Sequence, residues 1–334
     1  MKVLLTGATG FVGRGIAEAL AERGADLRCL VRSPARGAEL RSLGAELVVG
    51  SVDPAEGLEA AVSGVACVVH AAGCVRAWTR RQYFGTNELG TRRLAAAARE
   101  AGVRRFLYLS SLAASGPSAP GRPVTEESPP RPVNAYGRSK LAGERALEEE
   151  AGRRMEAVVI RPCAVYGPRD RDFLGLFRLV ERGLGLYAAA RGAELSLVFV
   201  DDLANLCCLA LERARAGSVY LAAADPSVTW RGLVEAIGAA LGRRPLCLRI
   251  PPSVLFPLAC AAALGRPFLA RPPVVSVGKV IEARQAGWVA SARRTAAELD
   301  WSPRVGLAEG TRRAAEWYRE RGWLRPARAG LSRD

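Results

Sequence analysis

The sequence predicts an α/β protein with a doubly wound parallel sheet and a smaller, mostly helical C-terminal lobe. Two observations lead to this fold class. Short apolar runs rich in Val and Leu alternate with Ala-, Arg- and Glu-rich stretches of helical spacing over the first 160 residues, which is the pattern of βαβ units. A glycine-rich segment directly follows the first apolar run, as expected where a strand turns into a helix.

The expected strands are short apolar runs, and a helical segment separates most of them from the next. Because such connections carry the chain back across the sheet, neighbouring strands are expected to be parallel. This order is typical of a Rossmann-type sheet. The strands are expected at 3–6, 27–31, 47–50, 66–70, 105–110 and 157–160, and helices at 16–23, 37–43, about 88–101 and about 135–151.

The domain organisation follows from the length and from a change of rhythm. A chain of 334 residues allows about two domains. Beyond Pro162, Pro, Gly and Arg interrupt the regular alternation, so a second, irregular part is expected. The expected boundaries are 1–165 for a Rossmann domain, 166–325 for a substrate-binding lobe interleaved with the sheet, 326–334 for a flexible tail, and near 195–245 for pieces that return to the sheet, such as 195–200 and 218–221.

The composition excludes several classes of protein. Apolar residues make up 49% and charged residues 24%, as in ordinary folded proteins rather than disordered chains. The net charge of +15 would permit binding to nucleic acid or to an anionic membrane. However, the arginines are dispersed along the chain, without a basic block, an aromatic RNA-binding motif or zinc-finger spacing. We therefore expect no nucleic-acid partner and favour an anionic small ligand.

The cysteines and the apolar runs predict where in the cell the protein is located. The eight cysteines form no Cys-x2-Cys pair, and one histidine accompanies them, so buried thiols are expected rather than a metal site. The first strand runs at once into the glycine-rich segment, which leaves no space for a signal peptide. No apolar run reaches the roughly 20 residues that span a bilayer. These features predict a cytoplasmic protein without a transmembrane segment.

The glycine-rich segment TGATGFVG carries the first functional prediction. Its glycines, Gly7, Gly10 and Gly13, are spaced G-x2-G-x2-G at the junction between the first strand and the first helix. This spacing permits a tight turn, a close approach of the backbone to a pyrophosphate, and close packing of the helix on the sheet. The expected cofactor-binding residues are Gly7, Thr9, Gly10, Phe11, Val12 and Gly13.

The end of the second strand predicts which dinucleotide binds. In such sites an acidic residue at this point holds the ribose 2′-hydroxyl, whereas an arginine accommodates a 2′-phosphate. Arg32 follows the strand here, with Ser33 and Arg36 nearby as potential helpers. NADP is therefore the preferred cofactor, and NAD stays open as the less favoured alternative, in which Arg32 is a solvated surface residue.

Beyond this loop the sequence resembles the extended short-chain dehydrogenase/reductase family, also called NAD-dependent epimerase/dehydratases. Seven segments match in order over most of the chain. They are TGATGFVG at 6–13, VHAAG at 69–73, NELGT at 87–91, SS at 110–111, YGRSK at 136–140, RP at 161–162 with VYGP at 165–168, and VDD at 200–202.

The resemblance implies a catalytic Ser111, Tyr136 and Lys140. Tyr136 and Lys140 are four residues apart, so on a helix they share one face. A phenol with a pKa near 10 is a poor base at neutral pH, and a neighbouring ammonium group stabilises its anion. In the family, the tyrosine exchanges a proton while the nicotinamide exchanges a hydride, and the serine orients the substrate oxygen. Counting back from Gly116 favours Ser111 over Ser110.

The resemblance also implies further cofactor contacts. The family often has an Asp after the glycine of the third strand, where Ser51 follows Gly50 here, so the adenine contact is less certain. His70 is expected to pack and to hydrogen-bond near the cofactor, with an acid or base role as the alternative. The remaining expected contacts are Ser51, Val52, Ala71, Ala72, Gly73, Tyr136, Lys140 and Pro162.

The substrate prediction rests on one departure from the family. Many nucleotide-sugar epimerases and dehydratases have an asparagine before the Val-Tyr-Gly-Pro segment, where this chain has Ala164. This favours the branches that resemble 3β-hydroxysteroid dehydrogenases and dihydroflavonol reductases. The leading hypothesis is an NAD(P)-dependent oxidoreductase that interconverts an alcohol and a ketone on a fairly apolar small molecule. A nucleotide-sugar epimerase or dehydratase, and a non-catalytic cofactor sensor, are the alternatives.

Two further features leave alternatives open. The apolar stretch 251–272, flanked by Arg266 and Arg271, is interpreted first as the core of the C-terminal lobe. A substrate wall or a contact with a membrane surface are the other interpretations. Family members often dimerise through helices of the Rossmann domain, and the segments 88–101 and 135–151 could form such a homodimer.

Overall fold

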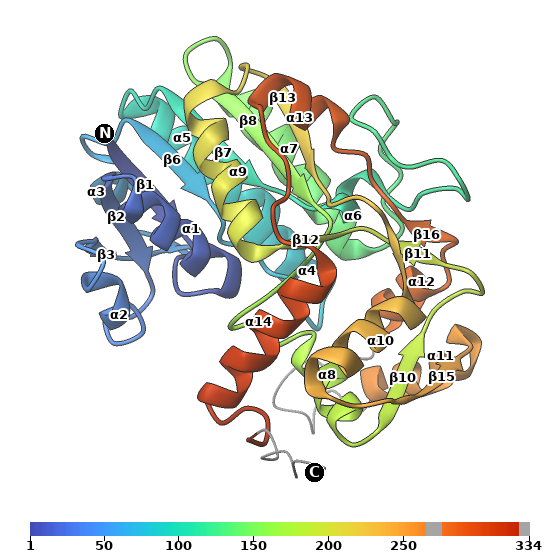
Figure 1. Cartoon of the computed structure of the whole chain (residues 1–334). Coiled ribbons are helices and arrows are strands. Elements are labelled where there is room, and N and C mark those ends of the chain that lie inside the picture. The colour runs from blue at the N-terminus through green and yellow to red at the C-terminus, as the bar shows by residue number, and fades with distance from the viewer. Residues whose placement is uncertain (265–275, 327–334) are drawn as a thin grey trace.

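The computed structural model describes residues 1–264 and 276–326, and its centre is a seven-stranded parallel sheet (Figure 1). The strand order is β13-β8-β7-β6-β1-β2-β3. β1 pairs with both β2 and β6, so the winding of the chain reverses there, and a ligand crevice is expected at the carboxyl ends of these strands. The strands are β1 (Lys2–Thr6), β2 (Asp26–Val31), β3 (Glu46–Val49), β6 (Cys67–His70), β7 (Arg105–Leu109), β8 (Glu156–Pro162) and β13 (Ser218–Ala222).

Helices cover both faces of this sheet, which confirms the predicted doubly wound fold (Figure 1). Along β1, Val3 and Leu5 belong to one hydrophobic core and Leu4 to the other, because successive side chains of a strand point to opposite faces. The first core is closed by α1 (Phe11–Glu22) and α9 (Val200–Arg213), and the second by α3 (Leu58–Val62), α5 (Thr91–Glu100) and α7 (Ala135–Ala151).

The segment expected as one helix at 88–101 is divided differently. It comprises α4 (Arg80–Phe84), a π-helical turn (Gly85–Gly90) and then α5. Thr79 begins α4 with a reciprocal cap, in which its side chain accepts a hydrogen bond from the Gln82 backbone. The predicted helix therefore began too late. Its apolar spacing starts only at Leu94, whereas side-chain capping and a wide turn define the preceding residues.

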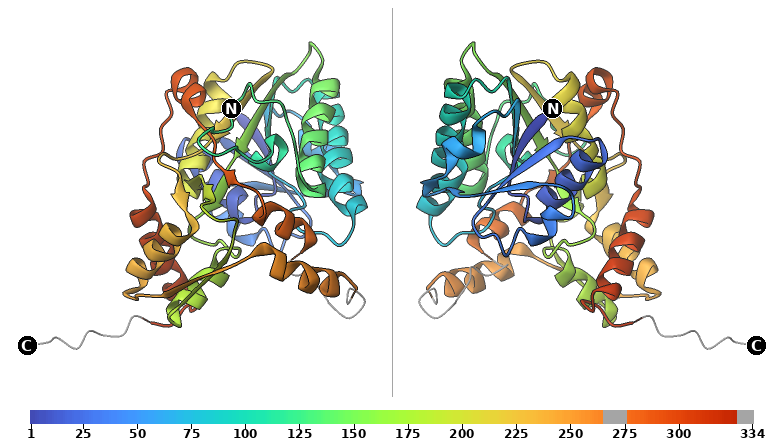
Figure 2. Two further views of the ribbon diagram at one scale, coloured as in Figure 1. Left: turned by 90° about the vertical axis from the view of Figure 1, so that its right-hand side faces the viewer. Right: turned by 90° about the vertical axis from the view of Figure 1, so that its left-hand side faces the viewer.

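The C-terminal lobe consists of helices and short strands beyond β8 (Figure 2). Its hydrophobic core includes Phe177, Phe199 and Tyr318, and α10 packs against both α14 and α8. Its elements are α8 (Leu174–Glu181), β10 (Leu184–Ala188), β11 (Glu194–Leu195), β14 (Val228–Thr229), α10 (Trp230–Leu241), β15 (Leu246–Ile250), α11 (Pro252–Leu264), α12 (Val277–Ala283), β16 (Gly287–Trp288) and α14 (Leu307–Glu320).

Two short segments and one helix complete the connections to the main sheet. β4 (Ser51–Val52) and β5 (Ala55–Glu56) pair with each other beyond the end of β3. α13 (Arg293–Leu299) packs against α9 and β13, so a late part of the chain contributes to the covering of the sheet. The other short helices are α2 (Ala38–Arg41) and α6 (Leu112–Ser115).

One of the two segments predicted to return to the main sheet does so, and the other does not. Residues 218–221 do return to the sheet as β13, but residues 195–200 do not. Leu197–Phe199, which form β12, pair instead with Ala164–Tyr166, which form β9, in a separate two-stranded sheet. The physical reason is that β13 already occupies the edge of the main sheet beside β8. Of the region 195–245, α9 and β13 lie on the sheet, whereas α10 packs on α14.

The apolar stretch 251–272 is not core where the structure describes it. Along α11, Val254 is 63% exposed and Leu258 is 58% exposed, while Pro252 and Ala259 are buried. The rest of this stretch, from residue 265, and the tail from residue 327 lie outside the described residues. Within residues 1–264 and 276–326, no helix combines the length and the apolar character needed to cross a membrane.

Candidate active site

The glycine loop between β1 and α1 has a backbone that larger residues would disrupt. Gly7 has a φ of +75°, and a Cβ there would lie 2.6 Å from the backbone nitrogen of Ala72. A Cβ on Gly13 would lie 2.1 Å from the carbonyl oxygen of Gly7. The loop therefore packs against both its own helix and the segment after β6, as the glycine spacing predicted.

The first turn of α1 presents backbone donors at the carboxyl edge of the sheet. Gly10 caps this 12-residue helix without a side-chain hydrogen bond, and its first turn contains no acidic residue. The first amides of a helix have no intrahelical partner and carry a positive partial charge. Thr9 and Gly10 are exposed, and Phe11 and Val12 are half-buried. This surface can hold a dinucleotide pyrophosphate.

Arg32 lies directly after β2, beside this loop in the topology. Arg32 and Arg36 are exposed, and neither forms an ion pair with a carboxylate in residues 1–264 and 276–326. Ser51 lies just beyond β3, where its hydroxyl donates to the carbonyl of Asp53. Val52 is buried against Gly90. The two arginines thus remain available for an anion.

The segment after β6 joins the glycine loop to Lys140. The backbone nitrogens of Ala71 and Ala72 donate to the carbonyl and to the hydroxyl of Thr6, respectively. A Cβ placed on Gly73 would lie 3.6 Å from Lys140 Nζ. The predicted contacts at residues 71–73 therefore lie between the glycine loop and the lysine.

His70 is a structural residue beneath this segment. It is fully buried, and its Nδ1 and Nε2 lie 2.7 and 3.1 Å from the hydroxyls of Thr6 and Thr91. Burial, with a contribution from the charge of Lys140, lowers the pKa of His70 to about 3. A neutral, enclosed imidazole with both nitrogens engaged fits the predicted packing role and not the acid or base alternative.

Ser110 and Ser111 point in different directions at the end of β7. Ser110 is buried and donates to Glu144, which also accepts two hydrogen bonds from the buried Arg161. Ser111 is half-buried, caps α6 and accepts a hydrogen bond from the Ala113 backbone. A hydrogen bond from Ser111 also acts on the pKa of Tyr136. Of the two serines, Ser111 is therefore the one beside Tyr136.

Tyr136 and Lys140 lie on one face of α7, as their spacing predicted. Burial raises the pKa of Tyr136 to about 12, against the opposing effect of the Ser111 hydrogen bond. Lys140 is buried, donates from Nζ to the Leu109 carbonyl at 2.7 Å, and lies 4.2 Å from the ring centre of Tyr108. Burial lowers the pKa of Lys140 to about 7. The site thus holds a protonated phenol near a lysine that titrates close to neutrality.

Asn87, in the π-helical turn, organises the site although sequence analysis gave it no role. Its side chain accepts from the Cys74 backbone nitrogen at 2.8 Å and donates to Ser139 Oγ at 2.9 Å. Ser139 in turn donates to the Tyr136 carbonyl. Asn87 therefore ties the segment after β6 to the helix that carries Tyr136. The NELGT match was the available signal, but it does not reveal these bonds.

Asn134, Tyr83 and Glu282 also surround Tyr136 without having been predicted. Asn134 caps α7 and donates from Nδ2 to Glu282 Oε1 at 2.6 Å, and the charge of Glu282 contributes to the raised pKa of Tyr136. The rings of Tyr83 and Tyr136 have centres 6.1 Å apart. Glu282 comes from α12 of the C-terminal lobe, and no local sequence signal could place it there.

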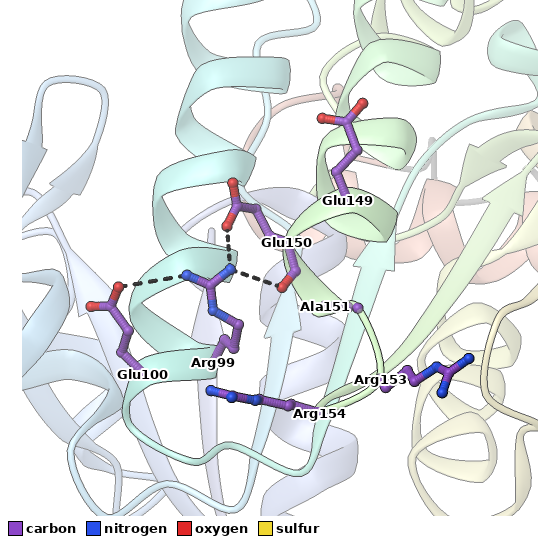
Figure 3. A pocket seen from close by; sticks show the side chains of 8 residues that line it. Arg99, Glu100, Glu149, Glu150, Ala151, Arg153 and Arg154 are labelled. Atoms are coloured by element: carbon purple, nitrogen blue, oxygen red, sulfur yellow. Dashed lines mark hydrogen bonds and ion pairs between the residues drawn. The ribbon is translucent and has the colours of Figure 1, made fainter.

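Two surface hollows differ in their relation to this site. A hollow of about 380 Å³ lies at the carboxyl edge of the sheet, next to Cys74 and Arg76, and the latter pairs with Asp172 of the C-terminal half. A larger hollow of about 680 Å³ lies at the opposite edge, where α5 and α7 end and Arg99 bonds to Glu150 (Figure 3). The first hollow is lined by Asp53, Cys74, Arg76, Ala77, Trp78, Gln82 and Thr86.

Pro162 closes the row of predicted cofactor contacts. It is the last residue of β8 and pairs with Ala222 of β13, so it also lies at the carboxyl edge of the sheet. The structure therefore brings the predicted residues to one edge, at the carboxyl ends of six neighbouring strands: β8, β7, β6, β1, β2 and β3.

Comparison with known proteins identifies the family. A model described as the NAD dependent epimerase/dehydratase family matches residues 3–223, which span the sheet from β1 to β13. The chain belongs to this family. A ceramide reductase of Caulobacter vibrioides (strain NA1000 / CB15N) is 30% identical over 323 residues, 96% of this chain and 96% of that protein.

Solved structures share the fold over nearly the whole chain. The crystal structure of gox2253 has a TM-score of 0.80 and 30% identity, and the match covers 96% of this chain and 99% of that one. MoeE5 in complex with UDP-glucuronic acid and NAD has a TM-score of 0.78 and 25% identity, covering 96% and 100%. The chain is therefore an oxidoreductase-type enzyme of the extended short-chain dehydrogenase/reductase kind, a group that contains both reductases and epimerases.

Proposed function

We propose that this enzyme is an NADP-preferring oxidoreductase that interconverts an alcohol and a ketone on a fairly apolar small molecule. The observation that carries the proposal is the arrangement of Ser111, Tyr136 and Lys140 at the carboxyl edge of the sheet, beside the glycine loop. This arrangement combines a proton donor, an orienting hydroxyl and a cation next to a dinucleotide site.

The chemistry of each side chain defines its role. A bound nicotinamide supplies or accepts the hydride. Tyr136, whose pKa of about 12 keeps it protonated at neutral pH, donates its phenolic proton to the oxygen of the ketone as the carbonyl is reduced. Ser111 holds that oxygen by a hydrogen bond. Lys140, fixed by the Leu109 carbonyl next to Gly73, reaches the cofactor ribose and favours the phenolate that remains.

Two features support the substrate and cofactor classes. Ala164, in β9, offers no side-chain amide to a nucleotide sugar, and the ceramide reductase similar over 96% of this chain is named for an apolar substrate. Arg32 and Arg36 are exposed beyond β2, where a 2′-phosphate would lie. The unpaired state of all eight cysteines is compatible with the proposed cytoplasmic location.

A nucleotide-sugar epimerase or dehydratase is the second candidate. The observation in its favour is the likeness to MoeE5, whose structure was solved with UDP-glucuronic acid and NAD. In that reaction class the substrate is oxidised transiently and the cofactor is regenerated. Product formation without net consumption of nicotinamide would identify this candidate.

The test follows the absorbance of reduced nicotinamide during incubation with apolar ketones. We expect NADPH to be consumed in proportion to the alcohol formed. Tyr136→Phe should lower kcat by about 10²- to 10⁴-fold, the usual contribution of general acid catalysis, and leave the Kd for NADPH unchanged. Tyr187→Phe, at a half-buried tyrosine of β10, is the matched control. Full activity in Tyr136→Phe would contradict the proposed mechanism.

The cofactor preference is tested separately by Arg32→Ala. We expect the Kd for NADPH to rise roughly tenfold, the effect of losing a charge-assisted hydrogen bond of about 1.5 kcal/mol, and the Kd for NADH to change little. Arg41→Ala, at an exposed arginine of α2, is the control. Equal changes in the two Kd values would show that Arg32 does not contact a 2′-phosphate.

A further inference from the structure

The helix α11 has an unusual surface for a protein exposed to water. Residues 251–264 include no charged side chain, yet Val254, Phe256 and Leu258 are 63, 39 and 58% exposed. A helix that is apolar on all sides is normally buried. Val254 and Leu258 share one face of the helix with the exposed Pro257 and Ala261, whereas Phe256 projects from another side. The four residues of this face, which we call the α11 surface, form an apolar patch that the described protein does not cover.

The strand that leads into α11 extends this apolar character. Leu246 and Leu248 of β15 are exposed, and Leu246 pairs with the exposed Leu184 of β10. A Cβ on Gly185, the next residue of β10, would lie 2.4 Å from Val234 of α10. Alternate residues of these strands thus face α10, and the leucines face away from it.

The stretch of sequence that contains α11 carries a net positive charge. Between residues 236 and 281 the chain has six basic residues and no acidic residue, although acidic side chains make up 33 of its 334 residues. Arg243, Arg244 and Arg249 are exposed on the approach to α11. Lys279, on the neighbouring α12, is paired with Glu282, so the arginines supply the net positive charge. A lipid bilayer with acidic headgroups has an anionic surface and an apolar interior, and an apolar patch bordered by cations is complementary to both.

The α11 surface is connected to the candidate active site through α12. α11 packs on α12, and Glu282 of α12 accepts a hydrogen bond from Asn134, which caps the helix of Tyr136. Figure 2 shows α11 at the margin of the C-terminal lobe, directed away from the seven-stranded sheet.

We propose that the α11 surface docks this enzyme on an anionic lipid bilayer. Val254 and Leu258, the two large side chains of this face, would insert among the acyl chains near the headgroups, and the surrounding arginines would attract acidic headgroups. A second copy of the chain fits less well, because two identical surfaces would bring their basic residues together. The benefit for catalysis, delivery of an apolar substrate from the bilayer, rests on the proposed function.

The experiment is flotation of the full chain with vesicles made of phosphatidylcholine and phosphatidylglycerol in equal parts. We expect the protein to float with these vesicles, to float less with pure phosphatidylcholine, and to be released by salt. The double variant Val254→Ser, Leu258→Ser should lower the partition coefficient at least about tenfold, because the buried apolar area sets the binding strength. Val49→Ser, at a valine of β3 that is 57% exposed, is the matched control for Val254→Ser.

The outcomes separate the alternatives. Wild-type protein that does not float, or a double variant that floats like the wild type, overturns the proposal. Concentration-dependent dimerisation that the double variant abolishes, without flotation of the wild type, assigns the α11 surface to a second copy instead. A cooperative thermal unfolding curve like that of the wild type, followed by far-ultraviolet circular dichroism, verifies that the variant is folded. Flotation needs no substrate, so failure of the proposed reaction leaves this result unaffected.

Discussion

At the scale of single residues, burial controls the ionisable groups of the site. His70 and Lys140 are both buried, and burial lowers the pKa of each, to about 3 and about 7. Both side chains have partners that hold them in place, namely threonine hydroxyls for His70 and the Leu109 carbonyl for Lys140. With a pKa of about 7, Lys140 is about half protonated at neutral pH in the free protein, whereas His70 is neutral there.

This shift predicts a dependence of stability on pH. Between about pH 7 and about 10.4, the ordinary pKa of lysine, the unfolded chain binds a proton on Lys140 that the folded chain does not, so the free energy of unfolding rises with pH. Lys140→Met should reduce this rise between pH 7 and 8.5 by about 1 kcal/mol per pH unit. Urea unfolding at several pH values measures the slope, with Lys2→Met as the control. An unchanged slope in Lys140→Met would refute the shifted pKa.

At the scale of elements, the sequence predicted the long helices and the strands of the main sheet, but not the pairing of the short strands outside it. The helix expected at about 135–151 is α7, with Asn134 as its cap. The strands of the sheet were recognisable because they are buried on both faces and therefore continuously apolar. By contrast, Glu194–Leu195 and Leu197–Phe199 are too short to carry a period, and their partners depend on tertiary structure.

The candidate site shows the same division. The glycine loop was predicted from its spacing after the first strand, whereas Ser111, Tyr136 and Lys140 were predicted from the resemblance to the family. The spacing of four residues then placed Tyr136 and Lys140 on one helix face. Glu282 reaches Asn134 from the C-terminal lobe, and the π-helical turn places Asn87 between Cys74 and Ser139. Such contacts depend on the packing of distant elements, which periodicity does not encode.

Two glycines near helix starts predict opposite effects of the same substitution. Gly13→Ala would place a Cβ 2.1 Å from the Gly7 carbonyl oxygen, so α1 must shift. Because this shift distorts the pyrophosphate-binding loop, we expect lower stability and at least about a tenfold loss of NADPH affinity. Gly175→Ala in α8 meets open space and should raise stability by up to about 1 kcal/mol. Thermal unfolding and NADPH titration measure both. Normal NADPH binding in Gly13→Ala would contradict the proposed pyrophosphate-binding loop.

At the scale of the whole molecule, the two halves of the chain are interlocked. β13 and α9 follow the first segments of the C-terminal lobe yet complete the sheet and its cover. Arg105 of β7 donates to the carbonyls of Ala210 and Leu211 at the end of α9, and Thr295 of α13 donates to the Leu221 carbonyl. Each half therefore supplies partners for buried groups of the other half.

This interlocking predicts that the chain unfolds in one cooperative transition. Five of the six tryptophans follow residue 229, so tryptophan fluorescence reports mainly on the C-terminal half, whereas far-ultraviolet circular dichroism reports on the whole chain. We expect the two thermal curves to coincide. NADPH at about 100 times its Kd should stabilise the protein by about 2.7 kcal/mol and shift both curves equally. Two outcomes would contradict this prediction: a fluorescence change at a lower temperature than the change in circular dichroism, or a shift with NADPH in the circular dichroism curve alone. Either would mean that the C-terminal lobe unfolds independently. Contacts such as that between Asn134 and Glu282 would then not couple the lobe to the cofactor site.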